Sequence, residues 1–318
     1  MRLHRVVAIS AAGLTLAACA GTSAGEPDAA PSTRAPTQAV APTATPTPTP
    51  TPPPPELPRG GRTIFPEHRL VGFAGGRGEA LGRLGIGDID ERASEIEKVA
   101  ASYTLDGRTP LPVFELIAVI AHRSPADGGL YRTREPAEVV ERYLAAARRH
   151  RGLLLLNVQP GRADFLDEVK ALEEWLLEPD VGLALDPEWA VGSRQVPGEV
   201  IGTTTGGELA AVAAYLSSLV RANDLPEKVM VYHQFHTRTV VDEAALGPHP
   251  GVVLVKSIDG VGHPADKIAT WNRLTPDLAP HVYTGFKLFY DEDRRNGPLM
   301  TQAEVLALRP QPSYVLYE

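Results

Sequence analysis

Residues 181–189 read Val181-Gly182-Leu183-Ala184-Leu185-Asp186-Pro187-Glu188-Trp189. The run begins with five small or apolar residues and ends in two carboxylates separated by one proline. An apolar run of this length is typical of a strand buried on both faces, as in a parallel sheet. Alternate side chains of a strand share a face, so we expect Asp186 and Glu188 to point the same way. At the carboxyl end of a barrel strand, that face looks into the mouth of the barrel.

Seven further runs of strand type occur, at residues 70–73, 111–121, 152–158, 228–233, 251–258, 281–289 and 313–317. Helical periodicity lies between most of them, most clearly at residues 90–103, 136–149, 165–176 and 205–220, and more weakly at 238–246, 264–273 and 301–308. Strands that alternate with helices over this length predict a (β/α)8 barrel of the TIM type. The chain stops directly after the eighth run, so we expect no helix to follow the last strand.

The first residues have the pattern of a secretory signal, with a charged start followed by an apolar run at residues 6–18 that is too short to span a membrane. This run ends in Leu16-Ala17-Ala18-Cys19, which resembles the lipobox of bacterial lipoproteins. The resemblance implies cleavage of residues 1–18 and attachment of diacylglycerol to Cys19. Cys19 is the only cysteine, so the chain forms no intramolecular disulfide.

Residues 19–60 are rich in proline, threonine, alanine and serine and have almost nothing to bury. We expect this segment to be a disordered tether with polyproline II character. It would hold a folded domain at residues 61–318 on the extracytoplasmic face of the membrane, anchored through the lipid on Cys19.

The composition restricts the partners of the folded domain. Of the 318 residues, 43% are hydrophobic, and the formal net charge is −8. No basic block occurs in the folded part, so nucleic acid is not an expected partner. The glycines at residues 72–78 lack the spacing of a dinucleotide-binding loop. We expect no cofactor and no resident metal.

Polar side chains occur near the ends of seven of the predicted strands, which is the pattern of a catalytic or binding mouth. They are Glu115, His122, Asn157, Gln159, Asp186, Glu188, Tyr232, His233, Gln234, His236, Lys256, Asp259, Lys287, Asp291 and Glu318. The alternative is that strand ends simply become polar where they reach solvent. Asp186 and Glu188 are the strongest candidates, because two neighbouring carboxyl groups raise the pKa of one of them and so supply a general acid beside an ionised partner.

Such a pair at the end of the fourth barrel strand resembles the chitinase and endo-glycosidase group. That resemblance implies Glu188 as the proton donor and Asp186 as the residue that orients an N-acetyl group of the substrate. Met230-Val231-Tyr232 is similar to the Met-x-Tyr of the same family, which implies that Tyr232 contacts the sugar. The chain departs from the family motif because Val181 and Ala184 stand at its two earlier aspartate positions. The pair is also similar to the barrel lysozymes, although the first strand lacks their aspartate.

Two other clusters leave alternatives open. His233 and His236 could belong to a metal site, but three residues apart on a strand they point to different faces unless the chain turns after His233. Lys256 is costly to bury without a carboxylate, and Asp186 or Glu188 is its expected partner.

The sequence therefore predicts a glycoside-hydrolase-like surface lipoprotein that acts on an envelope or extracellular polysaccharide, with Glu188 as general acid and Asp186 assisting. We expect the substrate to be bound by Asn157, Gln159, Trp189, Tyr232, His233, Gln234, Lys256, Asp259 and Lys287. Two alternatives remain. The same barrel could bind glycan or protein without catalysis, or it could be a metal-dependent hydrolase that uses His233 and His236.

Overall fold

The structure, a computed structural model, describes residues 53–104 and 107–318. The predicted signal peptide, Cys19 and nearly all of the predicted tether lie outside the described residues. No helix in the described part of the chain is both long enough and apolar enough to cross a bilayer.

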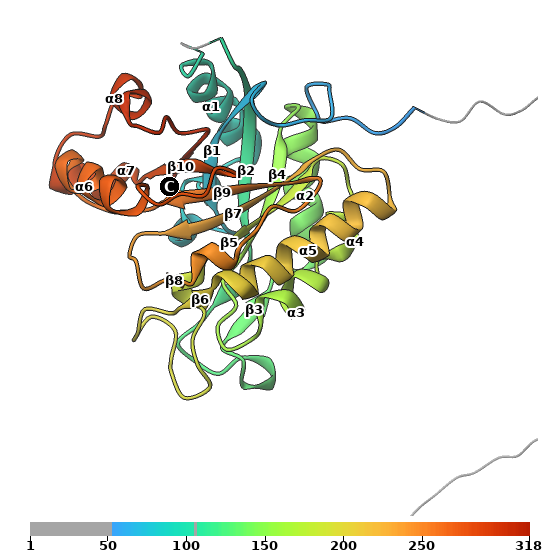
Figure 1. The fold of residues 1–318 in the computed structure, drawn as a ribbon, viewed down its shortest axis with the longest axis vertical. Coiled ribbons are helices and arrows are strands. Elements are labelled where there is room, and N and C mark those ends of the chain that lie inside the picture. Colours follow the sequence, from blue (N-terminus) through green and yellow to red (C-terminus); the bar gives the residue numbers. More distant parts are fainter. Residues whose placement is uncertain (1–52, 105–106) are drawn as a thin grey trace, which may run out of the picture. The chain divides into compact units, whose positions relative to one another are not determined.

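Eight parallel strands form a closed barrel (Figure 1). In order around the ring they are β1 (His68–Gly75), β2 (Thr109–Ala121), β4 (Leu153–Val158), β5 (Val181–Leu185), β7 (Lys228–Gln234), β9 (Val252–Ile258), β10 (Val282–Leu288) and β11 (Tyr314–Tyr317). The ring closes because β1 pairs with both β2 and β11. The eight predicted strands are all present, and the predicted (β/α)8 barrel is confirmed.

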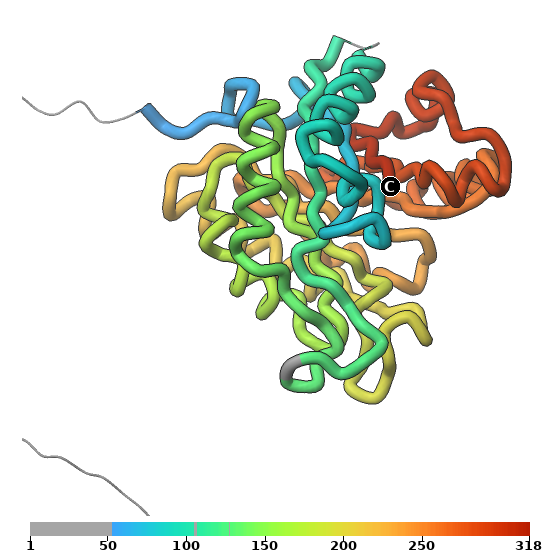
Figure 2. Tube along the Cα trace, turned by 180° about the vertical axis from the view of Figure 1, so that it is seen from behind, coloured from blue at the N-terminus to red at the C-terminus, as the bar shows by residue number. Residues whose placement is uncertain are grey.

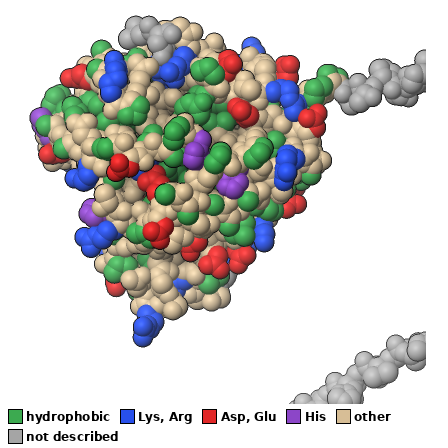
Figure 3. Space-filling view, viewed as in Figure 1, with side chains coloured by type: hydrophobic (Ala, Val, Ile, Leu, Met, Phe, Trp, Pro, Cys, Tyr) green, Lys and Arg blue, Asp and Glu red, His purple; other side chains and the backbone are tan. Residues whose placement is uncertain are grey.

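Helices cover the outside of the barrel. They are α1 (Ile89–Ala101), α2 (Ala137–Arg149), α3 (Phe165–Lys170), α4 (Glu173–Leu176), α5 (Gly206–Ala222), α6 (Pro264–Leu274), α7 (Tyr290–Asn296) and α8 (Gln302–Ala307). Figure 2 shows α1 and α2 side by side on one flank of the barrel, where they contact each other. Acidic and basic side chains are interspersed over the face seen in Figure 3.

Three segments differ from the sequence prediction. The helix predicted at residues 165–176 is broken at Leu172 into α3 and α4. Residues 238–246 form the short strand β8 (Val240–Val241) and a 3-10 turn (Glu243–Ala245) in place of a helix, with β8 paired to β6 (Thr204–Thr205). The short helix α7 was not predicted. In addition, β2 continues beyond the barrel and pairs antiparallel with β3 (Arg132–Arg134).

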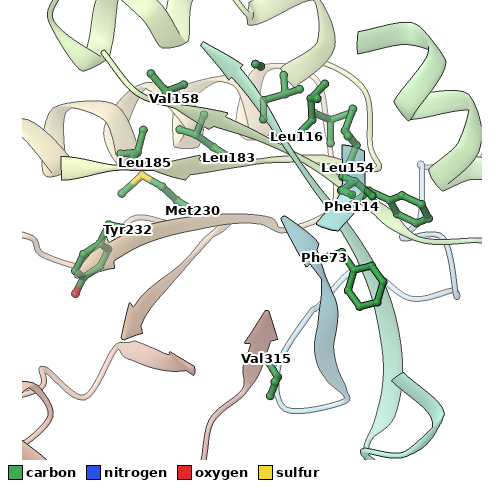
Figure 4. Close-up of a cluster of buried hydrophobic side chains, with 14 of the residues drawn as sticks. Phe73, Phe114, Leu116, Leu154, Val158, Leu183, Leu185, Met230, Tyr232 and Val315 are labelled. Carbon is green, nitrogen blue, oxygen red and sulfur yellow. The ribbon is translucent and has the colours of Figure 1, made fainter. Parts of the chain in front are cut away.

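Strand alternation separates two apolar layers. On β7, Val229 and Val231 face the barrel interior, whereas Met230 and Tyr232 belong to the layer between the strands and the helices. Figure 4 shows part of this outer layer, with Met230 of β7 beside Leu183 and Leu185 of β5. The alternation fixes which side chains of each strand face the barrel mouth, because side chains two positions apart share a face.

The amino end of the barrel is closed by the segment before β1. Leu57, Ile64 and Phe65 are buried against the inner apolar layer. At the seam between β1 and β2, a Cβ atom on Gly72 would lie 1.9 Å from the carbonyl oxygen of Val113, so only glycine permits this approach. With the amino end covered, the carboxyl end is where the interior meets solvent.

Candidate active site

A cavity of about 460 Å³ occupies the carboxyl end of the barrel, and we call it the central cavity. Each of the eight barrel strands contributes to its wall, either from the strand itself or from the residues that follow it. The lining residues are Ala74, Glu115, Ile117, Asn157, Gln159, Asp186, Glu188, Trp189, Phe235, Asp259, Val261, Lys287, Phe289 and Glu318. Such a convergence of polar groups in a largely apolar hollow is what a small-molecule or catalytic site requires.

Glu115 is a fully buried carboxylate on β2 at the floor of this cavity. Its Oε1 atom lies 3.0 Å from Nε2 of His233 and accepts a 3.0 Å hydrogen bond from Asn157 Nδ2. Its Oε2 atom accepts a 2.7 Å hydrogen bond from the hydroxyl of Tyr314. Burial alone would raise the pKa of Glu115, but the positive charge of His233 and these donors hold it below its usual value. Glu115 is therefore ionised.

His233 lies between two carboxylates beneath the cavity. Its Nδ1 atom is 2.8 Å from Oδ2 of Asp259, on the side opposite its contact with Glu115. Burial favours the neutral ring, but the charges of Asp259 and Glu115 raise the pKa of His233 well above its usual value. His233 is thus an imidazolium whose two nitrogens face two acids.

Lys287 on β10 completes this buried network. Its Nζ atom lies 2.5 Å from Oε2 of Glu318 and 3.7 Å from Oδ2 of Asp259. Although burial opposes the charged form, Glu318 and Asp259 raise the pKa of Lys287 well above its usual value. Asp259 also accepts a 3.1 Å hydrogen bond from Ser257. Burial would raise the pKa of Asp259, but His233 and Lys287 keep it lowered. The positive charges of His233 and Lys287 are thus compensated by the acids of the floor.

Asp186 lies at the wall of the cavity and is held by two side-chain amides. Asn157 Nδ2 donates to Oδ1 at 3.1 Å, and Gln159 Nε2 donates to Oδ2 at 3.1 Å. Burial raises the pKa of Asp186, Glu115 adds to this effect, and His233 and Lys287 oppose it. Two fixed donors hold both oxygens of this carboxylate in one orientation.

Glu188 differs from the other carboxylates of the site. It lies in a 3-10 turn (Pro187–Trp189) after β5, and its Oε2 atom is buried without a hydrogen-bond partner among the residues the structure describes. Burial raises the pKa of Glu188 well above its usual value, and the negative charges of Asp186 and Asp259 raise it further. Among the carboxyl groups of the site, Glu188 therefore has the strongest tendency to keep its proton.

Asp186 and Glu188 do not lie on one face of a strand, as their spacing predicted. The strand ends at Leu185, and Pro187 has no N–H with which to continue the ladder, so strand alternation does not place Glu188. The 3-10 turn, and not the strand, places Glu188 at the cavity. Both carboxyl groups line the central cavity.

Four of the predicted substrate contacts do not line the central cavity. Tyr232 points into the outer apolar layer, where its hydroxyl donates to Glu243 Oε1 at 2.5 Å (Figure 4). Lys256 also points outward and pairs with Glu243 Oε2 at 2.7 Å, so neither Asp186 nor Glu188 is its partner. Gln234 is buried and donates to the backbone oxygen of His236. His233 lies below the cavity.

The structure does not assemble the metal site considered for His233 and His236. His236 Nδ1 accepts a hydrogen bond from the backbone N–H of Arg238, while both nitrogens of His233 face carboxylates. Over residues 53–104 and 107–318, no group of three or more His, Cys, Asp and Glu side chains is arranged to hold a metal ion.

Asn157, Gln159, Asp186, Glu188, Trp189, Asp259 and Lys287 all line the cavity as expected from their positions at strand ends. Glu115 and Glu318 were predicted only as polar strand ends, and Tyr314 was not predicted to belong to the site. Tyr314 occupies an inward position of β11 within an apolar run. Its hydroxyl group is the feature of that run that indicates a polar partner.

The chain matches no protein-family model and no curated protein. A similar solved structure is a GH18 chitinase from Pseudoalteromonas aurantia, with a TM-score of 0.29 and 11% sequence identity. The similarity covers 79% of this chain and 93% of the chitinase chain. The strand order and pairing described above identify the fold as an eight-stranded β/α barrel without reference to any relative.

Proposed function

We propose that this protein hydrolyses glycosidic bonds of a polysaccharide, with Glu188 as general acid and Asp186 as its charged partner. The observation that carries the proposal is the buried carboxyl oxygen of Glu188, which has no hydrogen-bond partner in the described part of the chain and lies beside a second carboxyl group in one open cavity. A carboxylic acid kept neutral next to a carboxylate is the arrangement that glycoside hydrolysis uses.

The reaction divides between these two residues. Glu188 donates its proton to the glycosidic oxygen as the bond from the anomeric carbon to that oxygen breaks. Asp186, once ionised, stabilises the positive charge that develops at the anomeric carbon, or orients an N-acetyl group toward it. Water then supplies a hydroxyl group to the anomeric carbon, and its remaining proton returns to Glu188. Asn157 and Gln159 hold the Asp186 carboxylate in place throughout.

The cavity wall suits a sugar. Trp189, Phe235 and Phe289 provide apolar faces, while Gln159 and Lys287 provide donors for hydroxyl groups. The site of action that we propose is the extracytoplasmic surface, because the lipobox and the proline-rich segment would anchor and extend the barrel there.

The test begins by screening the wild-type protein against peptidoglycan and chitin-type oligomers and continues with the Glu188→Gln variant. We expect kcat/KM for the cleaved oligosaccharide to fall by about 10²–10⁴. A dinitrophenyl glycoside of the same sugar needs no protonation of its leaving group, so its loss should be far smaller. Glu174→Gln, on the exposed surface of α4, is the matched control. An equal loss for both substrates, or none, would refute the role of Glu188.

A second candidate is a glycan-binding protein without catalysis on the same barrel. It is favoured by the buried network in which His233 and Lys287 are paired with acids, and by Val181 and Ala184 at two aspartate positions of the chitinase motif. In that case the wild type and Glu188→Gln would bind the same oligosaccharides, and neither would cleave them.

A further inference from the structure

Two further cavities adjoin the central one. A cavity of about 480 Å³, which we call the acidic cavity, shares Val261, Phe289 and Glu318 with it. A smaller one of about 240 Å³, the apolar shelf, shares Glu188, Trp189 and Phe235 with it. The two outer cavities have no lining residue in common, so the central cavity lies between them. Together they form a groove across the barrel mouth.

The apolar shelf is formed by the loop after Trp189. Val200 and Ile201 are 39% and 58% exposed, and with Trp189 and Phe235 they present apolar surface to solvent. The loop is fastened at its end, because Gly202 N–H donates to the backbone oxygen of Glu188 at 2.7 Å. The shelf therefore keeps a fixed position relative to the proposed acid.

The loop after β2 supports the same shelf. In Figures 1 and 2 the green loop after β2 and the yellow loop after β5 project side by side from the lower end of the domain. Arg123 in the first loop donates to the backbone oxygen of Gly198 in the second at 3.1 Å. Since residues 196–201 are held from both sides, the apolar surface is a built part of the groove.

The position of Glu188 divides the groove. Glu188 lines both the central cavity and the apolar shelf, whereas Asp186 lines only the central cavity. A general acid must lie beside the bond that it protonates, between the reacting sugar and the leaving group. The reacting sugar therefore belongs in the central cavity, next to Asp186, and the leaving part of the chain belongs on the shelf. The remainder of the chain then extends into the acidic cavity.

Charge restricts the glycan further. Each of the three cavities is lined by more acidic than basic side chains. In the acidic cavity, Arg83 is already paired with Glu95 at 2.6 Å. A polysaccharide with uronic acid or phosphate groups would be repelled here, whereas an uncharged chain would not.

We infer that the groove binds a linear glycan without acidic substituents across all three cavities, so that cleavage at Glu188 is internal to the chain and its leaving part lies on Val200 and Ile201. This inference rests on the proposed function for the place of cleavage. The length and the charge of the bound glycan are inferred from the size and the acidic lining of the groove, and do not depend on the proposed function.

Binding can be tested without catalysis. In the Glu188→Gln variant, we expect the affinity for β-1,4-linked N-acetylglucosamine chains, measured by calorimetry, to rise from the dimer to the hexamer as more units enter the groove. A hyaluronan hexamer, in which glucuronate alternates with N-acetylglucosamine, should bind more weakly than the uncharged hexamer. Equal affinity for dimer and hexamer, or tighter binding of hyaluronan, would overturn the inference.

The shelf has its own test. Ile201→Ser should weaken hexamer binding by about fivefold, because the apolar contact with the sugar is lost, and should shift cleavage away from internal bonds. Ile268→Ser, a 37% exposed residue on α6 outside the three cavities, is the matched control and should leave binding and products unchanged. If the two variants bind and cleave alike, the shelf does not hold the leaving part.

The outcomes separate the two proposals. If the wild type cleaves no oligomer but affinity still rises with chain length, the catalytic role of Glu188 fails and the groove stands. If the wild type cleaves the oligomers but affinity does not depend on length, the groove fails and the general acid stands. If no oligomer binds or is cleaved, both fail.

Discussion

Replacing Glu188 by glutamine should stabilise the folded protein at neutral pH, although it removes the proposed acid. In the folded state, burial and the charges of Asp186 and Asp259 raise the pKa of Glu188 well above 4.5, the ordinary value for a glutamate side chain. Between pH 4.5 and that raised pKa, the unfolded chain has lost the proton and the folded protein keeps it. Folding must then take up a proton, so the free energy of unfolding falls as pH rises through this window.

The size of the effect follows from this proton uptake. Each pH unit within the window lowers the stability of the wild type by about 1.4 kcal/mol. Glutamine cannot ionise, so the variant escapes this loss. For a domain of this size the gain in Tm is roughly 3–5 °C per pH unit. The advantage should be near zero below pH 4.5 and grow with pH until the folded-state pKa is reached.

Thermal unfolding of the wild type and Glu188→Gln between about pH 4 and pH 8 measures this slope. Glu174→Gln, with the same chemical change on the exposed face of α4, should show no such slope. A Tm difference that does not depend on pH, or a variant less stable than the wild type throughout, would show that Glu188 does not hold its proton in the folded state.

Three further substitutions test the rest of the site. Asn157→Leu removes a hydrogen-bond donor to Asp186 and should therefore raise the pKa of that carboxyl group. The acidic limb of the kcat–pH profile should then move to higher pH. A limb that does not move contradicts the role assigned to Asp186. Tyr314→Phe removes the buried hydrogen bond to Glu115 and should lower the free energy of unfolding, measured by denaturant titration, by about 1.5–3 kcal/mol. This loss should become smaller as the pH falls and Glu115 becomes protonated. Tyr283→Phe, at an exposed tyrosine, is its control. Tyr232→Phe should leave kcat/KM unchanged in steady-state assays, because its hydroxyl lies outside the groove; a large loss would restore Tyr232 as a sugar contact.

The strands could be predicted because each is a nearly continuous apolar run, which burial on both faces of a barrel requires. The break at Leu172 could not be predicted, since the same apolar residues face the barrel whether the helix is continuous or bent there. The helix α7 was missed because its sequence, Tyr-Asp-Glu-Asp-Arg-Arg-Asn, has no apolar stripe.

The sequence allowed us to predict that the site residues lie at strand ends, but not which of their side chains face the cavity. Tyr232 and His233 are neighbours on a strand, so only one of them can face the barrel interior, and their residue types do not show which. The structure shows that Val229 and Val231 face inward, and His233 therefore does too. The predicted partner of Lys256 was wrong. Its actual partner, Glu243, lies in a segment that was expected to be helical. Glu188 reaches the cavity through a turn, and periodicity does not describe turns.

The contact between Arg123 and Gly198 has an evolutionary consequence. The charged groups of the floor are carried mainly by strand positions, whereas the shelf is carried by two loops that hold each other. Insertions or exchanges in these loops can therefore reshape the shelf without displacing the ionised groups beneath it. Under the proposed function, the reacting groups lie mainly on strands and the groups that select the glycan lie on loops, so the loops can vary while the reacting groups stay in place.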